Sequence, residues 1–192
     1  MTTGGEFMPY EVEMKFPLPT GSDLTSILHE LGAIASKPKG QRDRYFNHPT
    51  RDFVQTDEAL RLRDEDGTVH LTYKGPKLDT TTKTREEIEI PLGLGEGDVV
   101  SLVRILQKLG FREVAVVSKR RQEFLASWEQ VQTTLSIDDV DGVGRFIEIE
   151  QVASPATLDR ARESLARLAT HLGLGPGERR SYLELLLDGR ER

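Results

Sequence analysis

The 192-residue sequence lacks cysteine, long hydrophobic runs and an excess of positive charge. The absence of cysteine excludes a disulfide scaffold, a thiolate zinc site and a cysteine nucleophile. No apolar run approaches the ~20 residues that a membrane-spanning helix needs. With 26 Lys and Arg against 32 Asp and Glu, the chain lacks the basic character typical of nucleic-acid-binding proteins. These absences predict a cytoplasmic protein that binds neither membranes nor nucleic acids.

Residues 1–7 show no basic region followed by an apolar stretch, so they do not resemble a signal peptide. They are expected to form a flexible leader. The following residues, 8–190, are expected to form a single domain, because 36% hydrophobic residues supply enough apolar material for one core.

Two kinds of hydrophobic periodicity alternate along this domain. Apolar residues at helical spacing predict helices over residues 22–31, 99–109, 154–172 and 179–187. Alternation of apolar and polar residues predicts strands over residues 9–16, 41–48, 58–64, 69–74, 84–91, 114–128, 133–140 and 145–151. The sequence therefore predicts an α+β fold with mostly antiparallel strands.

Charged residues of one sign occur in pairs two positions apart in several of these strands. The acidic pairs are Glu11 with Glu13 and Glu148 with Glu150, and the basic pairs are Arg61 with Arg63 and Lys119 with Arg121. Residues two apart share one face of a strand, and the residues between them supply an apolar face. A solvated polar face explains any one strand, but like charges on neighbouring positions repel. The repeated pairing therefore favours bound ions: divalent cations at the carboxylates and phosphate at the Arg and Lys pairs.

The amphipathic helices indicate which way the charged faces point. The helices need an apolar surface to pack on, so the charged faces must point away from them. If the sheet closes, these faces line a barrel that holds water, metal and an anionic ligand, because unpaired buried charge is costly. The acids expected inside are Glu11, Glu13, Glu87, Glu89, Glu123, Asp138, Glu148 and Glu150, and the bases are Lys15, Arg61, Arg63, Lys74, Arg85, Lys119 and Arg121.

The motif Glu11-Val-Glu13-Met-Lys15 resembles the ExExK signature of the CYTH superfamily, the triphosphate tunnel metalloenzymes. Further blocks follow in the family's order: Asp43-Arg-Tyr-Phe46, Ala59-Leu-Arg-Leu-Arg63, Leu71-Thr-Tyr-Lys-Gly-Pro76, Arg85-Glu-Glu87, Val117-Ser-Lys-Arg-Arg121 and Asp138 to Glu150. The resemblance spans roughly Tyr10 to Leu187. It implies an eight-stranded antiparallel β-barrel tunnel with a charged interior and flanking helices.

The resemblance also implies roles for individual residues. It makes Glu11, Glu13, Asp138, Glu148 and Glu150 ligands of Mg²⁺ or Mn²⁺. It makes Lys15, Arg61, Arg63, Lys74, Arg85, Lys119 and Arg121 the residues that hold a triphosphate. Lys15 is in addition a candidate catalytic base if its neighbours depress its pKa, with a simple phosphate contact as the alternative.

Three functions fit this set of residues. The first is that of a class IV adenylyl cyclase, which converts ATP to cyclic AMP and pyrophosphate. The block Ser118 to Arg121 and the sequence Arg180-Ser-Tyr-Leu183 resemble bacterial members of that class, and closely similar blocks occur in proteins that hydrolyse triphosphates. The second is hydrolysis of thiamine triphosphate, a nucleoside triphosphate or inorganic tripolyphosphate. The third is a non-catalytic module that binds polyphosphate or nucleotide. The motifs do not separate cyclase from triphosphatase, and they leave open whether the chain forms a homodimer.

Overall fold

The computed structural model describes residues 10–19, 21–78, 84–93 and 96–190. Its strands are β1 (Tyr10–Pro17), β2 (Ile34–Ala35), β3 (Lys39–Asn47), β4 (Ala59–Glu65), β5 (Thr68–Lys74), β6 (Glu87–Leu92), β7 (Arg112–Trp128), β8 (Val131–Val140) and β9 (Gly144–Ala153). Its helices are α1 (Thr25–Glu30), α2 (Phe53–Thr56), α3 (Glu96–Lys108), the 3₁₀ turn η1 (Pro155–Thr157), α4 (Leu158–His171) and α5 (Tyr182–Arg190). The expected leader, residues 1–7, lies outside the described residues.

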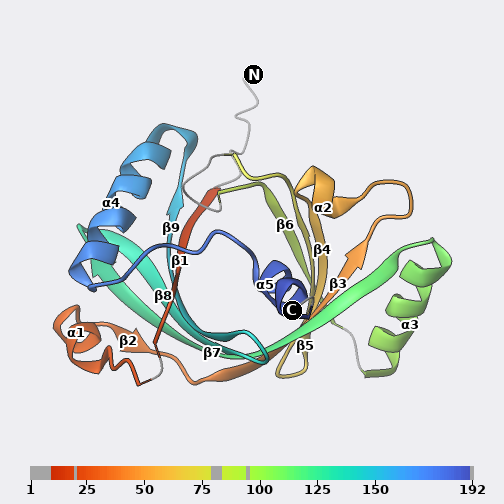
Figure 1. Cartoon of the computed structure of the whole chain (residues 1–192), viewed down its shortest axis with the longest axis horizontal. Helices are drawn as coiled ribbons and strands as arrows, with labels where there is room; N and C mark the ends of the chain where they lie inside the picture. Colours follow the sequence, from red (N-terminus) through yellow and green to blue (C-terminus); the bar gives the residue numbers. More distant parts are fainter. Residues whose placement is uncertain (1–9, 20, 79–83, 94–95, 191–192) are drawn as a thin grey trace.

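All strand pairs are antiparallel and belong to one sheet, whose order is β1-β9-β8-β7-β3-β4-β5-β6. These eight strands confirm the predicted antiparallel barrel-like α+β fold. The short β2 is an addition that pairs with β7. Within the described ranges, β1 and β6 are the edge strands of the sheet. Between these two edges the sheet curls into a half-barrel (Figure 1).

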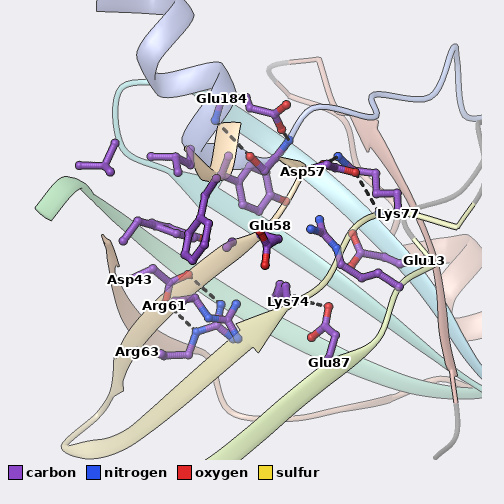
Figure 2. Close-up of a pocket in the computed structure, with 18 of the residues that line it drawn as sticks. Glu13, Asp43, Asp57, Glu58, Arg61, Arg63, Lys74, Lys77, Glu87 and Glu184 are labelled. Atoms are coloured by element: carbon purple, nitrogen blue, oxygen red, sulfur yellow. Dashed lines mark hydrogen bonds and ion pairs between the residues drawn. The ribbon is translucent and has the colours of Figure 1, made fainter. Parts of the chain in front are cut away.

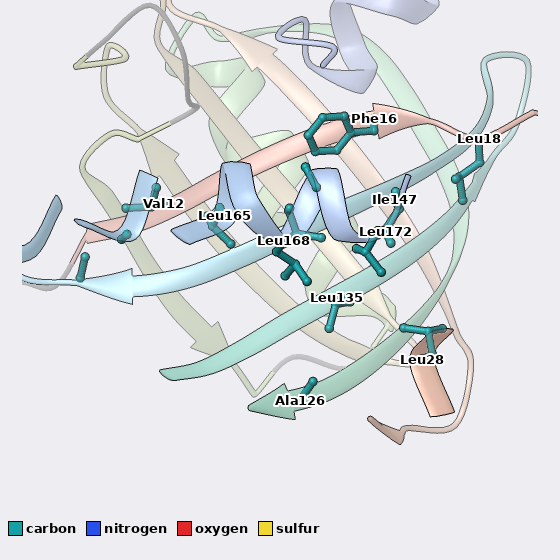
Figure 3. Packing of buried hydrophobic residues seen from close by; sticks show 14 residues of the cluster. Val12, Phe16, Leu18, Leu28, Ala126, Leu135, Ile147, Leu165, Leu168 and Leu172 are labelled. Atoms are coloured by element: carbon teal, nitrogen blue, oxygen red, sulfur yellow. The ribbon is translucent and has the colours of Figure 1, made fainter. Parts of the chain in front are cut away.

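The convex side of the sheet carries the main core, as the periodicity predicts. On one half, α4 packs on β1, β8 and β9, with Leu165 and Leu168 fully buried against Val12 and Ile147 (Figure 3). On the other half, α3 places Leu106 beside Phe46 and Leu62. Both helices therefore flank the sheet and leave its concave side to polar residues. None of the helices in the described part of the chain is long and apolar enough to cross a bilayer.

The helix α5 lies on the concave side, not on the flank (Figure 1). It packs in a cluster with Tyr45, Val117 and Phe146, whose side chains make one end of the concave face apolar. The concave face is charged as predicted, and this end of it is apolar. The physical reason is that α5 has its own apolar residues, Leu183 and Leu186 among them, and needs a surface on which to bury them.

Candidate functional site

The concave side of the sheet contains a cavity of about 370 Å³ whose walls come from both halves of the sheet. Of the twelve candidate site residues, ten line it: Glu11, Glu13, Arg61, Arg63, Lys74, Arg85, Lys119, Arg121, Glu148 and Glu150. Figure 2 shows Glu13 on one side of the cavity, with Arg61, Arg63 and Lys74 across from it. Alternation along each strand explains the arrangement, because every second side chain points inward.

Strand pairing builds the acidic wall. In the β1–β9 register, Glu13 lies directly opposite Glu150 and Lys15 lies opposite Glu148. Burial and the nearby charges of Glu11 and Glu13 raise the pKa of Glu150 to about 8. Burial, followed by the charge of Glu87, also raises the pKa of Glu11. The carboxylates of this wall therefore repel one another, and a positive charge placed between them would relieve that repulsion.

The donor chemistry of this wall fits a hard divalent cation. Mg²⁺ and Mn²⁺ prefer oxygen ligands, and Mg²⁺ is commonly held by one or two carboxylates plus water and substrate phosphate. Among the described residues no three acidic or histidine side chains converge as a ready metal cage.

The basic wall begins on β4, where alternate arginines point inward. Arg61 is only 7% exposed and donates to Thr72 (3.0 Å) and to Glu89 (3.1 Å). Among the described residues its buried Nε has no hydrogen-bond partner, which is unusual for a buried donor. Arg63 instead makes a two-pronged ion pair with Asp43, at 2.6 and 2.7 Å. The Arg63 guanidinium offsets the burial of the Asp43 carboxyl and holds its pKa well below the usual range.

The basic wall continues on β7. Arg121 donates through Nε and Nη2 to the carboxylate of Asp138 (2.7 and 2.5 Å) and also contacts Glu148. The Nζ of Lys119 lies 3.5 Å from the same Asp138 carboxylate. Burial, together with the charge of Arg121, lowers the pKa of Lys119 to about 7. A bound polyanion would favour the charged form of this lysine.

Two candidate site residues, Lys15 and Asp138, do not line the cavity. Lys15 is 2% exposed, and its Nζ donates to the backbone carbonyl of Arg180. Asp138 is fully buried between Arg121 and the Tyr182 hydroxyl. Both lie behind the wall, in contact with the C-terminal segment. Contact of Lys15 with phosphate and of Asp138 with metal therefore remain predictions.

The wider set of expected interior charges divides in a similar way. Glu87 and Glu89 line the cavity, whereas Glu123 does not. Glu87 forms an ion pair with Lys74.

Further residues, outside the predicted charged set, complete the cavity. Its uncharged part is made by Tyr45, Phe46, Phe53, Val54, Ala59, Val114, Tyr182 and Leu183, and Asp57, Glu58, Lys77 and Glu184 also line it. All but Lys77 come from strands β3, β4 and β7, from the α2 region and from α5. The motifs Asp43 to Phe46 and Arg180 to Leu183 contain Tyr45 and Tyr182, but neither motif indicated that these side chains line the cavity.

The family model of the CYTH domain matches residues 9–182, so the chain belongs to the CYTH family. A candidate adenylate cyclase of Methanocaldococcus jannaschii is 40% identical over 91% of this chain and 97% of its own length. The adenylate cyclase CyaB of Aeromonas hydrophila is 29% identical over 92% of this chain and 88% of its own length. Human thiamine-triphosphatase is 31% identical over 85% of this chain and 77% of its own length.

A solved structure has the same fold. The PH1819 protein of Pyrococcus horikoshii superposes with a TM-score of 0.80 at 39% identity, covering 93% of this chain and 98% of that protein. The half-barrel with its helices is therefore a CYTH fold, and the relatives carry names from two reaction classes.

Proposed function

We propose that this chain is a divalent-metal-dependent enzyme that binds a triphosphate in the cavity and breaks one of its phosphoanhydride bonds. The observation that carries the proposal is that one cavity gathers both kinds of charge: Arg61 lies across it from Glu13 (Figure 2), and Lys119, Arg121 and Glu150 line the same cavity. A pure anion-binding module gains little from buried acids beside its ligand, because they repel phosphate unless a cation lies between them.

The acidic residues Glu11, Glu13, Glu148 and Glu150 are the proposed metal-binding residues. A bound Mg²⁺ or Mn²⁺ would supply Lewis-acid stabilisation of the phosphate oxygens. The arginines provide fixed positive charge where negative charge develops as the bond breaks, and they need no reorganisation to do so. Arg61 is the clearest of these, because its Nε is buried without a partner from residues 10–19, 21–78, 84–93 and 96–190.

Adenylate cyclase is the first candidate reaction. In it the ribose 3′ oxygen attacks the α-phosphorus of ATP, so that cyclic AMP forms and pyrophosphate leaves. Two relatives with adenylate cyclase in their names support it, as does the uncharged side of the cavity, where Tyr45, Phe53 and Ala59 could contact a nucleoside. Hydrolysis is the second candidate: water attacks the terminal phosphorus and orthophosphate leaves. The human thiamine-triphosphatase relative supports it.

A product assay distinguishes these reactions. The purified protein would be incubated separately with ATP, thiamine triphosphate and tripolyphosphate, each with Mg²⁺, with Mn²⁺ or with EDTA. We expect metal-dependent turnover of ATP to cyclic AMP and pyrophosphate in equal amounts. Orthophosphate without cyclic AMP would assign hydrolysis instead. A protein that binds these compounds but releases no product under any condition would contradict an enzymatic role.

A further inference from the structure

The side chain of Tyr182 lies where the C-terminal segment meets the basic wall. Tyr182 is the first residue of α5 and is 6% exposed. Reciprocal bonds at the start of the helix fix its position: the Glu184 backbone N–H donates to the Ser181 hydroxyl (3.1 Å), and the Ser181 N–H donates to the Glu184 carboxylate (2.5 Å). The aromatic ring therefore projects from a capped helix end into a defined place.

The hydroxyl of Tyr182 continues a hydrogen-bonded chain into the cavity wall. It donates to Oδ2 of Asp138 at 2.8 Å, in a buried contact. The same Oδ2 accepts from Nη2 of Arg121, and Oδ1 accepts from Nε of Arg121. Asp138 thus has both oxygens engaged, and its orientation fixes the plane of the Arg121 guanidinium. Because Arg121 lines the cavity, a contact in α5 is transmitted to the wall that faces the ligand.

The ring of Tyr182 makes a second connection, to two ammonium groups. The Nζ of Lys15 lies 4.1 Å from the ring centroid and that of Lys119 lies 4.9 Å from it. The Phe146 ring packs edge-on against the Tyr182 ring, with 5.2 Å between the two ring centroids, and this contact limits rotation of the Tyr182 side chain. The electron-rich face of an aromatic ring attracts cations, and most strongly where water is excluded. The ring therefore attracts the ammonium groups of both lysines.

We propose that Tyr182 is a positioning residue for the basic wall. Through Asp138 it orients Arg121, and through its ring it holds Lys15 and Lys119. This inference rests on the proposed function, because its expected consequence is a change in the turnover of a triphosphate and in the affinity of the basic wall for it. The alternative is that Tyr182 only anchors α5 in the apolar cluster around Tyr45 and Val117.

Three variants separate positioning from anchoring. Tyr182→Phe removes the hydroxyl and keeps the ring, whereas Tyr182→Leu removes both. The control is Leu186→Ala, which loosens α5 in the same cluster from a position that does not line the cavity. The measurements are thermal unfolding, kcat and KM with the triphosphate that the wild type turns over, and affinity for tripolyphosphate in EDTA. Acetylation of Lys15 and Lys119 by acetic anhydride is measured in the metal-free protein by mass spectrometry.

We expect Tyr182→Phe to lower kcat about tenfold to a hundredfold and to change tripolyphosphate affinity less than about threefold, because the hydrogen bond to charged Asp138 is lost and the ring remains. Tyr182→Leu should in addition weaken tripolyphosphate binding about tenfold and increase acetylation of both lysines severalfold. Leu186→Ala should lower the unfolding temperature without these changes.

If the wild type is active and Tyr182→Phe behaves like Leu186→Ala, the positioning role is wrong and the proposed function stands. Unchanged lysine acetylation in Tyr182→Leu would also overturn the role of the ring, without reference to turnover. A wild type that neither binds nor turns over any triphosphate would overturn the proposed function, and this inference with it.

Discussion

Replacing Glu150 with glutamine is expected to stabilise the metal-free protein while lowering metal-dependent turnover by at least about a hundredfold. The side chain is half-buried opposite Glu13, and its pKa is raised to about 8 by this partial burial and by the acids around it. A neutral amide of similar size removes the charge repulsion between this side chain and the nearby acids. The same change removes a proposed oxygen ligand of the metal, so that the substitution separates stability from function.

The pH dependence of this effect has a definite sign. A carboxyl whose pKa is higher in the folded protein than in the unfolded chain destabilises the fold progressively as pH rises from about 4.5 to about 8. The gain in the free energy of unfolding from Glu150→Gln should therefore be absent near pH 4 and largest above pH 8. Above pH 8 this gain should be on the order of 2 to 4 kcal/mol, or roughly 5 to 10 °C in unfolding temperature.

Metal provides the second arm of this experiment. Saturating Mg²⁺ or Mn²⁺ should raise the unfolding temperature of the wild type more than that of Glu150→Gln, because ligand binding stabilises only the protein that binds it. The matched control is Glu163→Gln on α4, whose side chain is 73% exposed and which should change neither stability nor turnover. A Glu150→Gln protein that is less stable than wild type at pH 8 without metal would contradict the repulsive acidic wall.

The charged face of the sheet could be predicted because it follows from period-two alternation, which Glu11, Glu13, Arg61 and Arg63 carry in their sequence positions. Strand register, which the sequence does not state, decides which of these charges neutralise one another. Asp43 lies opposite Arg63 in the β3–β4 pair and forms a buried ion pair with it. Arg61, two residues earlier, instead has a buried Nε that meets no hydrogen-bond partner in the part of the chain that the structure describes. Two arginines of one motif therefore have different environments.

The location of α5 could not be predicted from periodicity. An amphipathic segment shows that it needs an apolar partner, but not which of several apolar surfaces it will cover. Here the partner is the apolar end of the concave face, around Val117 and Phe146. The consequence is large for the site, since α5 brings Tyr182 and Leu183 into the cavity wall and covers Lys15. Short elements such as α2, a single turn capped by Asp52, also lie below the length at which periodicity is informative.

Because Arg61 and Arg63 have different environments, we expect replacement by methionine to lower activity at Arg61 and stability at Arg63. We expect Arg61→Met to keep the fold and to lower kcat/KM for the triphosphate about a hundredfold to a thousandfold, because a fixed charge beside the phosphates is lost. Its protein partner Glu89 has a side chain that is 40% exposed, so the loss of that ion pair should cost at most about 1 kcal/mol.

Arg63→Met should instead lower the stability of the fold, because it leaves Asp43, 1% exposed, as an unpaired buried carboxylate. Breaking a buried pair in this way costs about 3 to 5 kcal/mol, and adding Asp43→Asn should restore much of that stability, since the stranded charge is then removed.

Denaturant unfolding of the two single variants and the double variant measures this coupling, and turnover of the Arg61→Met protein measures the other effect. If Arg63→Met were as stable as wild type, the Asp43 ion pair would not be the main partner of Arg63. If Arg61→Met kept wild-type kcat/KM, the unpartnered Nε would not be a phosphate donor, and the arginine would serve the sheet through Thr72 and Glu89 alone.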